Sequence, residues 1–155
     1  MIFVTVGTTH MQFERFFRAL ERLPSEQLVV QHGPSPAPAG VGRAVAFMSF
    51  PEMLDHFERA DKVVTHAGVG SILCAIAAGH TPVVIPRLKR HPGEHFDNHQ
   101  GELAQALADE GKVIPVWDEQ QLAEALAAAP PRRPPPALVE ARPIHAALRA
   151  ALLDG

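Results

Sequence analysis

One stretch decides the fold of this chain: Val63-Val64-Thr65-His66-Ala67-Gly68-Val69-Gly70-Ser71-Ile72-Leu73. It opens with β-branched apolar residues that favour a buried strand, passes through a short glycine-rich turn, and enters an alanine-rich helical pattern running from Ser71 to Gly79. A strand that feeds a helix through such a turn leaves backbone N–H groups and the positive end of the helix dipole pointing one way. The stretch therefore predicts a site for an anion, most often a phosphate.

Strand and helix patterns alternate along the rest of the chain. Besides the strand that opens the quoted stretch, strands are expected at residues 2–6, 28–30, 44–50, 82–86 and 113–116. Helices are expected over residues 13–20, from Pro51 through Phe57, over 94–108, and from Asp118 through Leu126. Because the strands are apolar along their length, they predict a single Rossmann-like, doubly wound parallel sheet with helices on both faces. Ligands of such sheets bind beyond the carboxyl ends of the strands, where the loops gather.

Size and composition narrow the class of protein. The chain has 155 residues, 46% apolar and 20% charged, with a net charge of −3, which indicates a globular domain and gives no general attraction to nucleic acid. Cys74 is the single cysteine, which fits a reducing compartment, and no apolar run is long enough to span a bilayer. We expect a cytoplasmic protein with an α/β domain at residues 1–129, a proline-rich linker at 130–136 and a C-terminal amphipathic helix at 137–155.

Four motifs, in this order, resemble the C-terminal, donor-binding half of family-28 glycosyltransferases, which have the two-domain GT-B fold. They are Phe3-Val4-Thr5-Val6-Gly7-Thr8, His66 to Leu73, Pro82 to Arg87, and Gly93-Glu94-His95-Phe96-Asp97-Asn98-His99-Gln100. The chain is most similar in kind to stand-alone versions of that half, such as the small catalytic subunit of the two-part UDP-GlcNAc transferase of N-glycan synthesis and its bacterial exopolysaccharide counterparts. The resemblance covers about residues 1–116.

The resemblance implies a role for each matching residue. The central turn would hold the diphosphate of a UDP-sugar, and the loop after the first strand would close on the same phosphates or on the acceptor. Residues 50–53 would read uracil through the backbone, and the side chains after residue 96 would hydrogen-bond the donor sugar. The donor-binding residues so implied, with Arg87 added because it follows a strand, are Gly7, Thr8, Thr9, Phe50, His66, Ala67, Gly68, Gly70, Ser71, Arg87, Asp97, Asn98 and Gln100. His10 is the candidate catalytic base, although the partner could supply it instead.

The same resemblance implies a reaction and a partner. Transfer would proceed with inversion, and the helix end rather than a required metal would stabilise the leaving diphosphate, so that no cofactor is expected. A separate, membrane-associated chain would bind a lipid-linked acceptor in surface polysaccharide synthesis; self-association is also left open. The final helix would either dock on that partner or pack on this domain's own sheet. Cys74 stands where related sequences have an acidic residue for the ribose. Because a thiol is a weak acceptor, either donor binding is weaker here or Asp97 or Glu102 compensates.

Other interpretations of the motifs fit less well. A dinucleotide fingerprint needs a third glycine near Leu73 and an acidic end to the next strand, which instead ends at Pro86-Arg87. The spacing from His91 to His95 matches one metallopeptidase pattern, but Pro92-Gly93 would interrupt the helix that it needs. His66 is either a phosphate ligand or a structural histidine, and the basic loop after Pro86 is either functional or merely solvated. The alternative function is a nucleotide-sugar binding or regulatory module without transfer activity.

Overall fold

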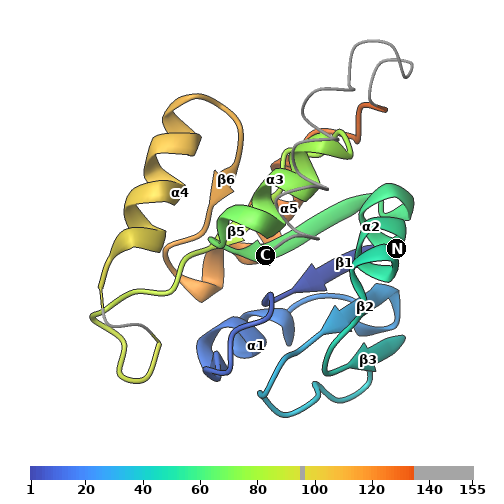
Figure 1. Ribbon diagram of the computed structural model, residues 1–155, viewed down its shortest axis with the longest axis horizontal. Helices are drawn as coiled ribbons and strands as arrows, with labels where there is room; N and C mark the ends of the chain where they lie inside the picture. The colour runs from blue at the N-terminus through green and yellow to red at the C-terminus, as the bar shows by residue number, and fades with distance from the viewer. Residues whose placement is uncertain (95–96, 135–155) are drawn as a thin grey trace.

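The computed structural model describes residues 1–94 and 97–134 and shows a parallel sheet between two layers of helices (Figure 1). Within the described residues the sheet has six strands in the order β3-β2-β1-β4-β5-β6, and every neighbouring pair is parallel. The strands are β1 (Ile2–Thr5), β2 (Leu28–Gln31), β3 (Arg43–Val45), β4 (Lys62–His66), β5 (Val83–Ile85) and β6 (Ile114–Pro115). The predicted single doubly wound α/β sheet is confirmed.

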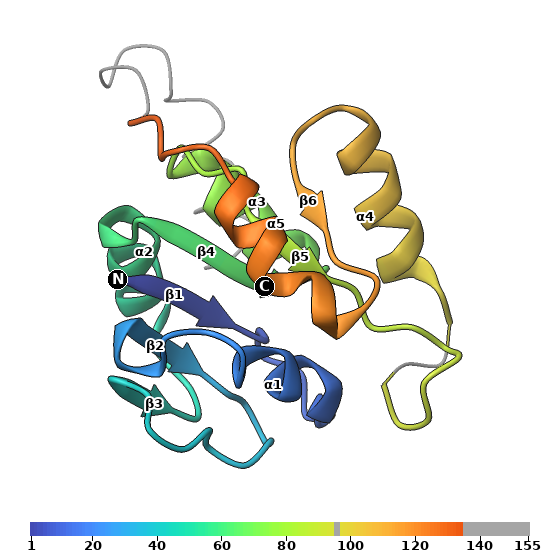
Figure 2. The same ribbon diagram turned by 180° about the vertical axis from the view of Figure 1, so that it is seen from behind.

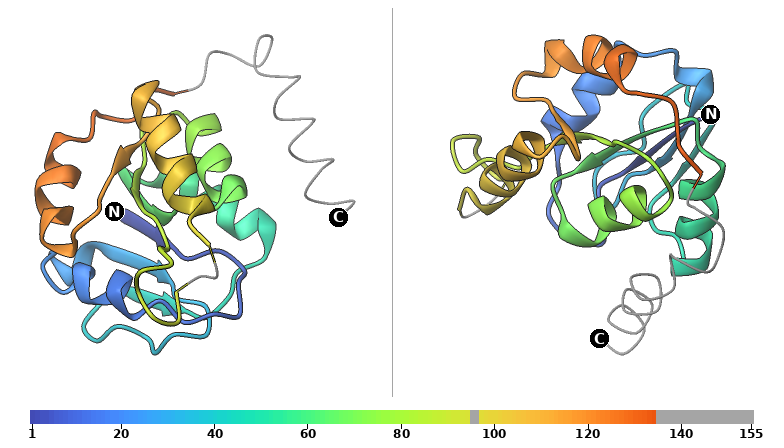
Figure 3. Two further views of the ribbon diagram at one scale, coloured as in Figure 1. Left: turned by 90° about the vertical axis from the view of Figure 1, so that its left-hand side faces the viewer. Right: turned by 90° about the horizontal axis from the view of Figure 1, so that it is seen from above.

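The helices cover both faces of the sheet. Helices α1 (Glu14–Leu20) and α5 (Leu122–Ala128) lie on one face, which Figure 2 shows from the front. On the other face lie α2 (Phe50–Arg59), α3 (Val69–Ala77) and α4 (His99–Asp109), and the view from above in Figure 3 shows the sheet between the two layers. Two short 3-10 turns, η1 (Ser25–Gln27) and η2 (Glu119–Gln121), precede β2 and α5.

The central strand β1 is buried on both faces, as its apolar sequence predicts. Val4 packs in a cluster with Phe16 and Leu122 from α1 and α5, whereas Phe3 points the other way into a cluster with Phe57 of α2. Both β1 side chains are completely inaccessible to solvent. Covering both faces is what makes an all-parallel sheet stable, because its strands carry no polar side. The core therefore holds the carboxyl ends of β1 and β4 side by side.

Several predicted boundaries are wrong, and hydrogen bonds or ion pairs account for two of them. The third strand ends at Val45 rather than Phe50, because Ser49 begins α2 by accepting a hydrogen bond from the Glu52 backbone in a capping box. Helix α4 begins at His99 rather than Glu94. The Glu94 carboxylate forms a buried ion pair with Arg15 instead. The opening helix α3 begins two residues before Ser71, with Gly68 as its N-cap, and the last strand keeps only Ile114–Pro115.

The first half of the predicted linker is bound to the domain. Arg132 donates to the carbonyl of Ala78 at 2.7 Å and the Arg133 backbone donates to the carbonyl of Gly79 at 2.8 Å, both just past the end of α3. In Figure 1 this red segment lies at the end of α3 farthest from the carboxyl ends of the strands. Pro135, Pro136 and the helix predicted at 137–155 lie outside the described residues. In the part of the chain that the structure describes, no helix is long and apolar enough to cross a bilayer.

Candidate donor-binding site

A cavity of about 240 Å³ opens at the carboxyl edge of the sheet, beside the ends of β1, β2 and β4. Because β2 and β3 lie on one side of β1 and β4 to β6 on the other, this is the point where the chain reverses its direction across the sheet. Ligands of open α/β sheets bind at such a point. The cavity is lined by Gly7, Thr8, Gln31, Phe47, Met48, Phe50, Met53, Phe57, His66, Gly68, Gly70, Ser71 and Cys74.

Three of the loops that the sequence placed together do meet at this cavity. The loop after β1 contributes Gly7 and Thr8, the start of α2 contributes Phe50, and the turn between β4 and α3 contributes the largest group. Those residues of the turn are His66, Gly68, Gly70 and Ser71. Their assignment to a donor remains a prediction, but the shared cavity gives them one ligand to bind.

The start of α3 supplies unfilled hydrogen-bond donors to the cavity. Among the described residues no side chain caps Gly68, and the first intrahelical bond of the turn runs from the Ile72 backbone to the Gly68 carbonyl. The N–H groups of Val69, Gly70 and Ser71 precede that bond and have no partner within the helix. Together with the positive end of the helix dipole, they favour an anionic group at this position.

The His66 ring separates the two glycine turns of the site. A Cβ atom placed on Gly68 would lie 2.2 Å from His66 Nε2, and one on Gly7 would lie 2.6 Å from His66 Cε1. Gly7 also has φ +71°, a conformation that side chains disfavour. Both positions therefore require glycine, because the ring occupies the space that any side chain would take. The ring thereby sets the spacing between the loop after β1 and the start of α3.

His66 is neutral at physiological pH. Burial lowers its pKa to about 3, and the positive charge of Arg87 acts in the same direction. Its Nδ1 lies 3.3 Å from the Thr65 hydroxyl. A neutral imidazole offers one donor and one acceptor rather than a charge, so the positive potential of this site comes from the helix end rather than from His66.

One wall of the cavity is apolar and comes from α2 and the segment between β3 and α2. Phe47, Met48, Phe50 and Met53 line it, and Phe57 lies buried behind them. Phe47 is 55% exposed, which is unusual for an aromatic side chain with a core available nearby. Sequence reasoning missed Phe47, because an aromatic residue near the end of an expected strand has no feature that distinguishes it from a core residue. An exposed ring beside a polar turn suits the flat face of a base.

Of two further residues in the cavity lining, Cys74 and Gln31, the sequence analysis identified only the first. Cys74 lies one turn along α3 from Ser71, and burial raises the pKa of its thiol, so that it offers a neutral and weakly polar surface. The sequence had singled it out. Gln31 was missed, although a polar residue at the end of the apolar run Leu28 to Val30 is the kind of signal that identifies a site at a strand's carboxyl end.

Arg87 does not line the cavity, contrary to the role expected for its side chain. It is 1% exposed, and its guanidinium donates to the backbone carbonyls of Gln12 at 2.8 Å and Met11 at 3.0 Å while lying 4.4 Å from the centre of the Phe13 ring. Burial lowers the pKa of Arg87 to about 10, and the neighbouring Glu94 opposes that shift. Arg87 thus fastens the loop after β1 to the loop after β5.

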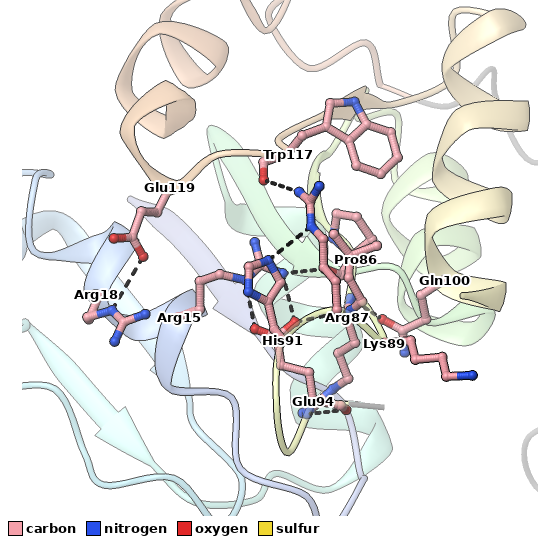
Figure 4. Close-up of polar contacts among 12 residues, drawn as sticks. Arg15, Arg18, Pro86, Arg87, Lys89, His91, Glu94, Gln100, Trp117 and Glu119 are labelled. Atoms are coloured by element: carbon pink, nitrogen blue, oxygen red, sulfur yellow. Dashed lines mark hydrogen bonds and ion pairs between the residues drawn. The ribbon is translucent and has the colours of Figure 1, made fainter. Parts of the chain in front are cut away.

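A buried ion pair completes this connection (Figure 4). Arg15 of α1 donates to both carboxylate oxygens of Glu94, at 2.7 and 2.8 Å, and to the Pro86 carbonyl at 2.7 Å. Glu94 also accepts from the Leu88 backbone at 3.1 Å. The loop after β5 is therefore folded against α1 by charged groups that are nearly inaccessible to solvent.

The remaining predicted residues lie outside the cavity lining. Asn98 accepts from the Lys89 backbone and Gln100 from the Arg87 backbone, each at 3.0 Å, so both amides hold the loop after β5. The Asp97 carboxylate accepts from the His99 backbone at 3.0 Å. The other three are Thr9, whose hydroxyl accepts from the Met11 backbone, Ala67, which is buried in the core, and His10, which is exposed.

Metal ligands do not gather anywhere in the described residues: no three His, Cys, Asp or Glu side chains there are placed to hold an ion. His91 lies in the loop after β5 and its Nε2 is 3.3 Å from Arg90 Nε. The second histidine of the sequence pattern, His95, is outside the described residues.

The fold and the cavity define the class: an α/β domain whose cavity opens at a glycine turn and a helix start, at the carboxyl edge of a parallel sheet. Residues 1–136 match the family described as Glycosyltransferase family 28 C-terminal domain. The chain therefore belongs to this family, as its motifs predicted.

Individual relatives agree with the family. Over 68 residues, 44% of this chain, it is 37% identical to the UDP-N-acetylglucosamine transferase subunit ALG13 of Yarrowia lipolytica. Two solved structures share its fold at 21% identity: the glycosyltransferase SnogD from Streptomyces nogalater, with TM-score 0.56 over 80% of this chain, and the glycotransferase of kitacinnamycin, with TM-score 0.58 over 81%. The matches span only 32% of the ALG13 chain and 33% and 34% of the two structures. The fold corresponds to the C-terminal half of a GT-B glycosyltransferase.

Proposed function

We propose that this domain binds a UDP-sugar in the cavity and acts as the donor-binding catalytic subunit of an inverting glycosyltransferase. The acceptor would be lipid-linked, in bacterial surface polysaccharide synthesis, and a separate membrane-associated chain would bind it. The observation that carries the proposal is the uncapped start of α3 facing the same cavity as the apolar wall at Phe47. The first suits a diphosphate and the second suits a base, and both are needed for a nucleoside diphosphate.

Each wall of the cavity would take one part of the donor. The diphosphate would meet the backbone of Gly68 to Ser71 and the loop at Gly7 and Thr8, and the uracil would lie against Phe47. A cavity of about 240 Å³ is slightly smaller than the ~300–1,000 Å³ of common small-molecule sites. The sugar would therefore extend beyond the mouth, toward the acceptor. The leaving diphosphate would gain its stabilisation from the helix end, so that transfer would need no metal.

Calorimetric titration with uridine, UMP and UDP tests the donor site. Affinity should rise along this series, because each phosphate adds a charged acceptor for the helix start. Phe47→Ala should weaken all three ligands with little effect on the melting temperature, since the ring is exposed. Thr8→Ala removes a hydroxyl at the cavity. Its matched control is Thr81→Ala, at the opposite edge of the sheet. Failure of the unmodified protein to bind UDP at millimolar concentration would refute the assignment.

The activity itself needs the partner. Transfer from a UDP-sugar should appear when the partner is added and should survive EDTA. The location implied is cytoplasmic, at the inner face of the membrane through that partner. Cys74 favours a second candidate, a binding or regulatory module, because a thiol at the cavity is a weak acceptor for ribose hydroxyls. UDP binding without turnover in the presence of the partner would favour that module.

A further inference from the structure

The side chain of Gln31 lies between the loop after β1 and the segment that carries Phe47, and both of its N–H donors are engaged. It stands at the end of β2 and is 2% exposed. Its Nε2 donates to the Gly7 carbonyl at 3.0 Å and to the Ala46 carbonyl at 2.7 Å, and its Oε1 accepts from the Thr5 hydroxyl at 2.6 Å. A carboxamide has two N–H donors and one oxygen. The group therefore joins three segments and leaves no donor for a ligand.

These bonds fix the peptides on both sides of Gly7. The Thr5 hydroxyl, which donates to Gln31, accepts from the Gly7 backbone at 3.1 Å. In a trans peptide the C=O and the following N–H point in opposite directions. Because the Gly7 carbonyl points to Gln31, the Thr8 N–H is directed away from it, and Thr8 lines the cavity. The carboxamide thus sets the direction of the Thr8 N–H, a donor in the loop after β1.

The second bond fixes the apolar wall. The Ala46 carbonyl accepts from Gln31 and also from the Gly33 backbone at 2.9 Å. Ala46 directly precedes Phe47, so that the peptide carrying the exposed ring is held in a defined plane. Gln31 therefore couples the placement of the loop after β1 to the placement of this ring.

We propose that Gln31 is a positioning residue for donor binding, whose carboxamide orients the Gly7–Thr8 peptide toward the diphosphate and anchors the Phe47 wall. It acts through these backbones and does not touch the donor. This inference rests on the proposed function, since it concerns the same cavity. Removing the donors of Gln31 lets the Gly7–Thr8 peptide rotate, which removes one hydrogen bond to a charged group from the bound state. Such a bond is worth roughly tenfold or more in affinity.

Calorimetric titration of three variants and the unmodified protein with UDP and with uridine tests the inference. Gln31→Glu keeps the shape but places a carboxylate against two carbonyls, Gln31→Met keeps the length without polar atoms, and exposed Gln120→Glu is the control. Both Gln31 variants should lose about tenfold or more in UDP affinity, and the UDP-to-uridine affinity ratio should fall. Gln120→Glu should match the unmodified protein. A merely structural role would weaken both ligands equally and leave the ratio unchanged, which would overturn the inference.

The Thr5 hydroxyl gives an independent pair of variants for the case in which the Gln31 variants do not fold. Thr5→Val removes the hydroxyl that links Gln31 to the Gly7 backbone while preserving volume in β1, and Thr5→Ser restores it. The affinity ratio should fall in Thr5→Val and recover in Thr5→Ser. Equal ratios in the two would refute the positioning role. If the unmodified protein bound neither UDP nor uridine, the proposed function would fail instead.

Discussion

Replacing Gly68 by alanine should disturb the site by a known contact. The new Cβ would lie 2.2 Å from His66 Nε2, about 1.2 Å closer than the 3.4 Å lower limit of ordinary contact, so that the ring or the turn must move. The Gly68 backbone has φ −81°, which alanine adopts freely, and the cost therefore comes from overpacking alone. Overpacking of a filled interior costs about 1–3 kcal/mol. In urea this corresponds to a midpoint lower by roughly 1 M.

A double-mutant cycle separates this cause from others. In a His66→Ala background the space is empty, so that Gly68→Ala should lose most of its cost, a coupling of at least ~1 kcal/mol. Gly101→Ala is the matched control, because its Cβ would meet the flexible end of Leu88 at 2.9 Å and alanine favours helix α4. That variant should be nearly neutral. A Gly68→Ala cost that is unchanged without the His66 ring would refute the spacing role of His66.

Three further perturbations have expected outcomes. Glu94→Gln breaks the buried pair with Arg15 and should lower the free energy of unfolding by about 3–5 kcal/mol in urea titrations, whereas Arg18→Gln, which removes an exposed pair with Glu119, should cost about 1 kcal/mol or less. Burial lowers the pKa of folded His66 from 6.5 to about 3, so the unfolded chain takes up the proton first. The contribution of His66 to the free energy of unfolding should then be complete above pH 6.5 and should decline as the pH falls toward 3, by up to about 1.4 kcal/mol per pH unit. In His66→Asn, the free energy of unfolding measured by urea titration should depend less steeply on pH over this range. Arg87→Met keeps the buried stem but frees the Met11 and Gln12 carbonyls; amide exchange over residues 8–13 should accelerate, and unchanged exchange would contradict the fastening role of Arg87.

Local patterns in the sequence predicted the parts of the site that depend on neighbouring residues. The turn from His66 to Ser71 was predicted as a helix start at a strand end because β-branched residues, glycines and a helical run follow one another directly. The cluster of Gly7, Thr8 and Phe50 with that turn followed from parallel-sheet topology, since all of them come after strands.

Contacts between distant residues could not be predicted in this way. Arg87 was expected to meet a phosphate because it is basic and follows a strand, but its guanidinium is taken by carbonyls 75 and 76 residues earlier in the chain. Gln31 makes its bonds to residues 15, 24 and 26 positions away. The hydrogen-bond partners of both side chains depend on which loops pack against each other. That packing cannot be read from residue types and spacing in a single sequence.

The bonds of Arg132 and Arg133 to the end of α3 have a practical consequence for attaching this domain to a surface. Arg133 lies beside Gly79, whereas the cavity lies at the other end of α3, a nine-residue helix about 14 Å long. A linker joined directly after Pro134 would therefore hold the domain by the edge opposite the cavity, with the mouth turned outward. Immobilisation at this position is the orientation of choice for sensor-chip measurements with nucleotides or with a large partner.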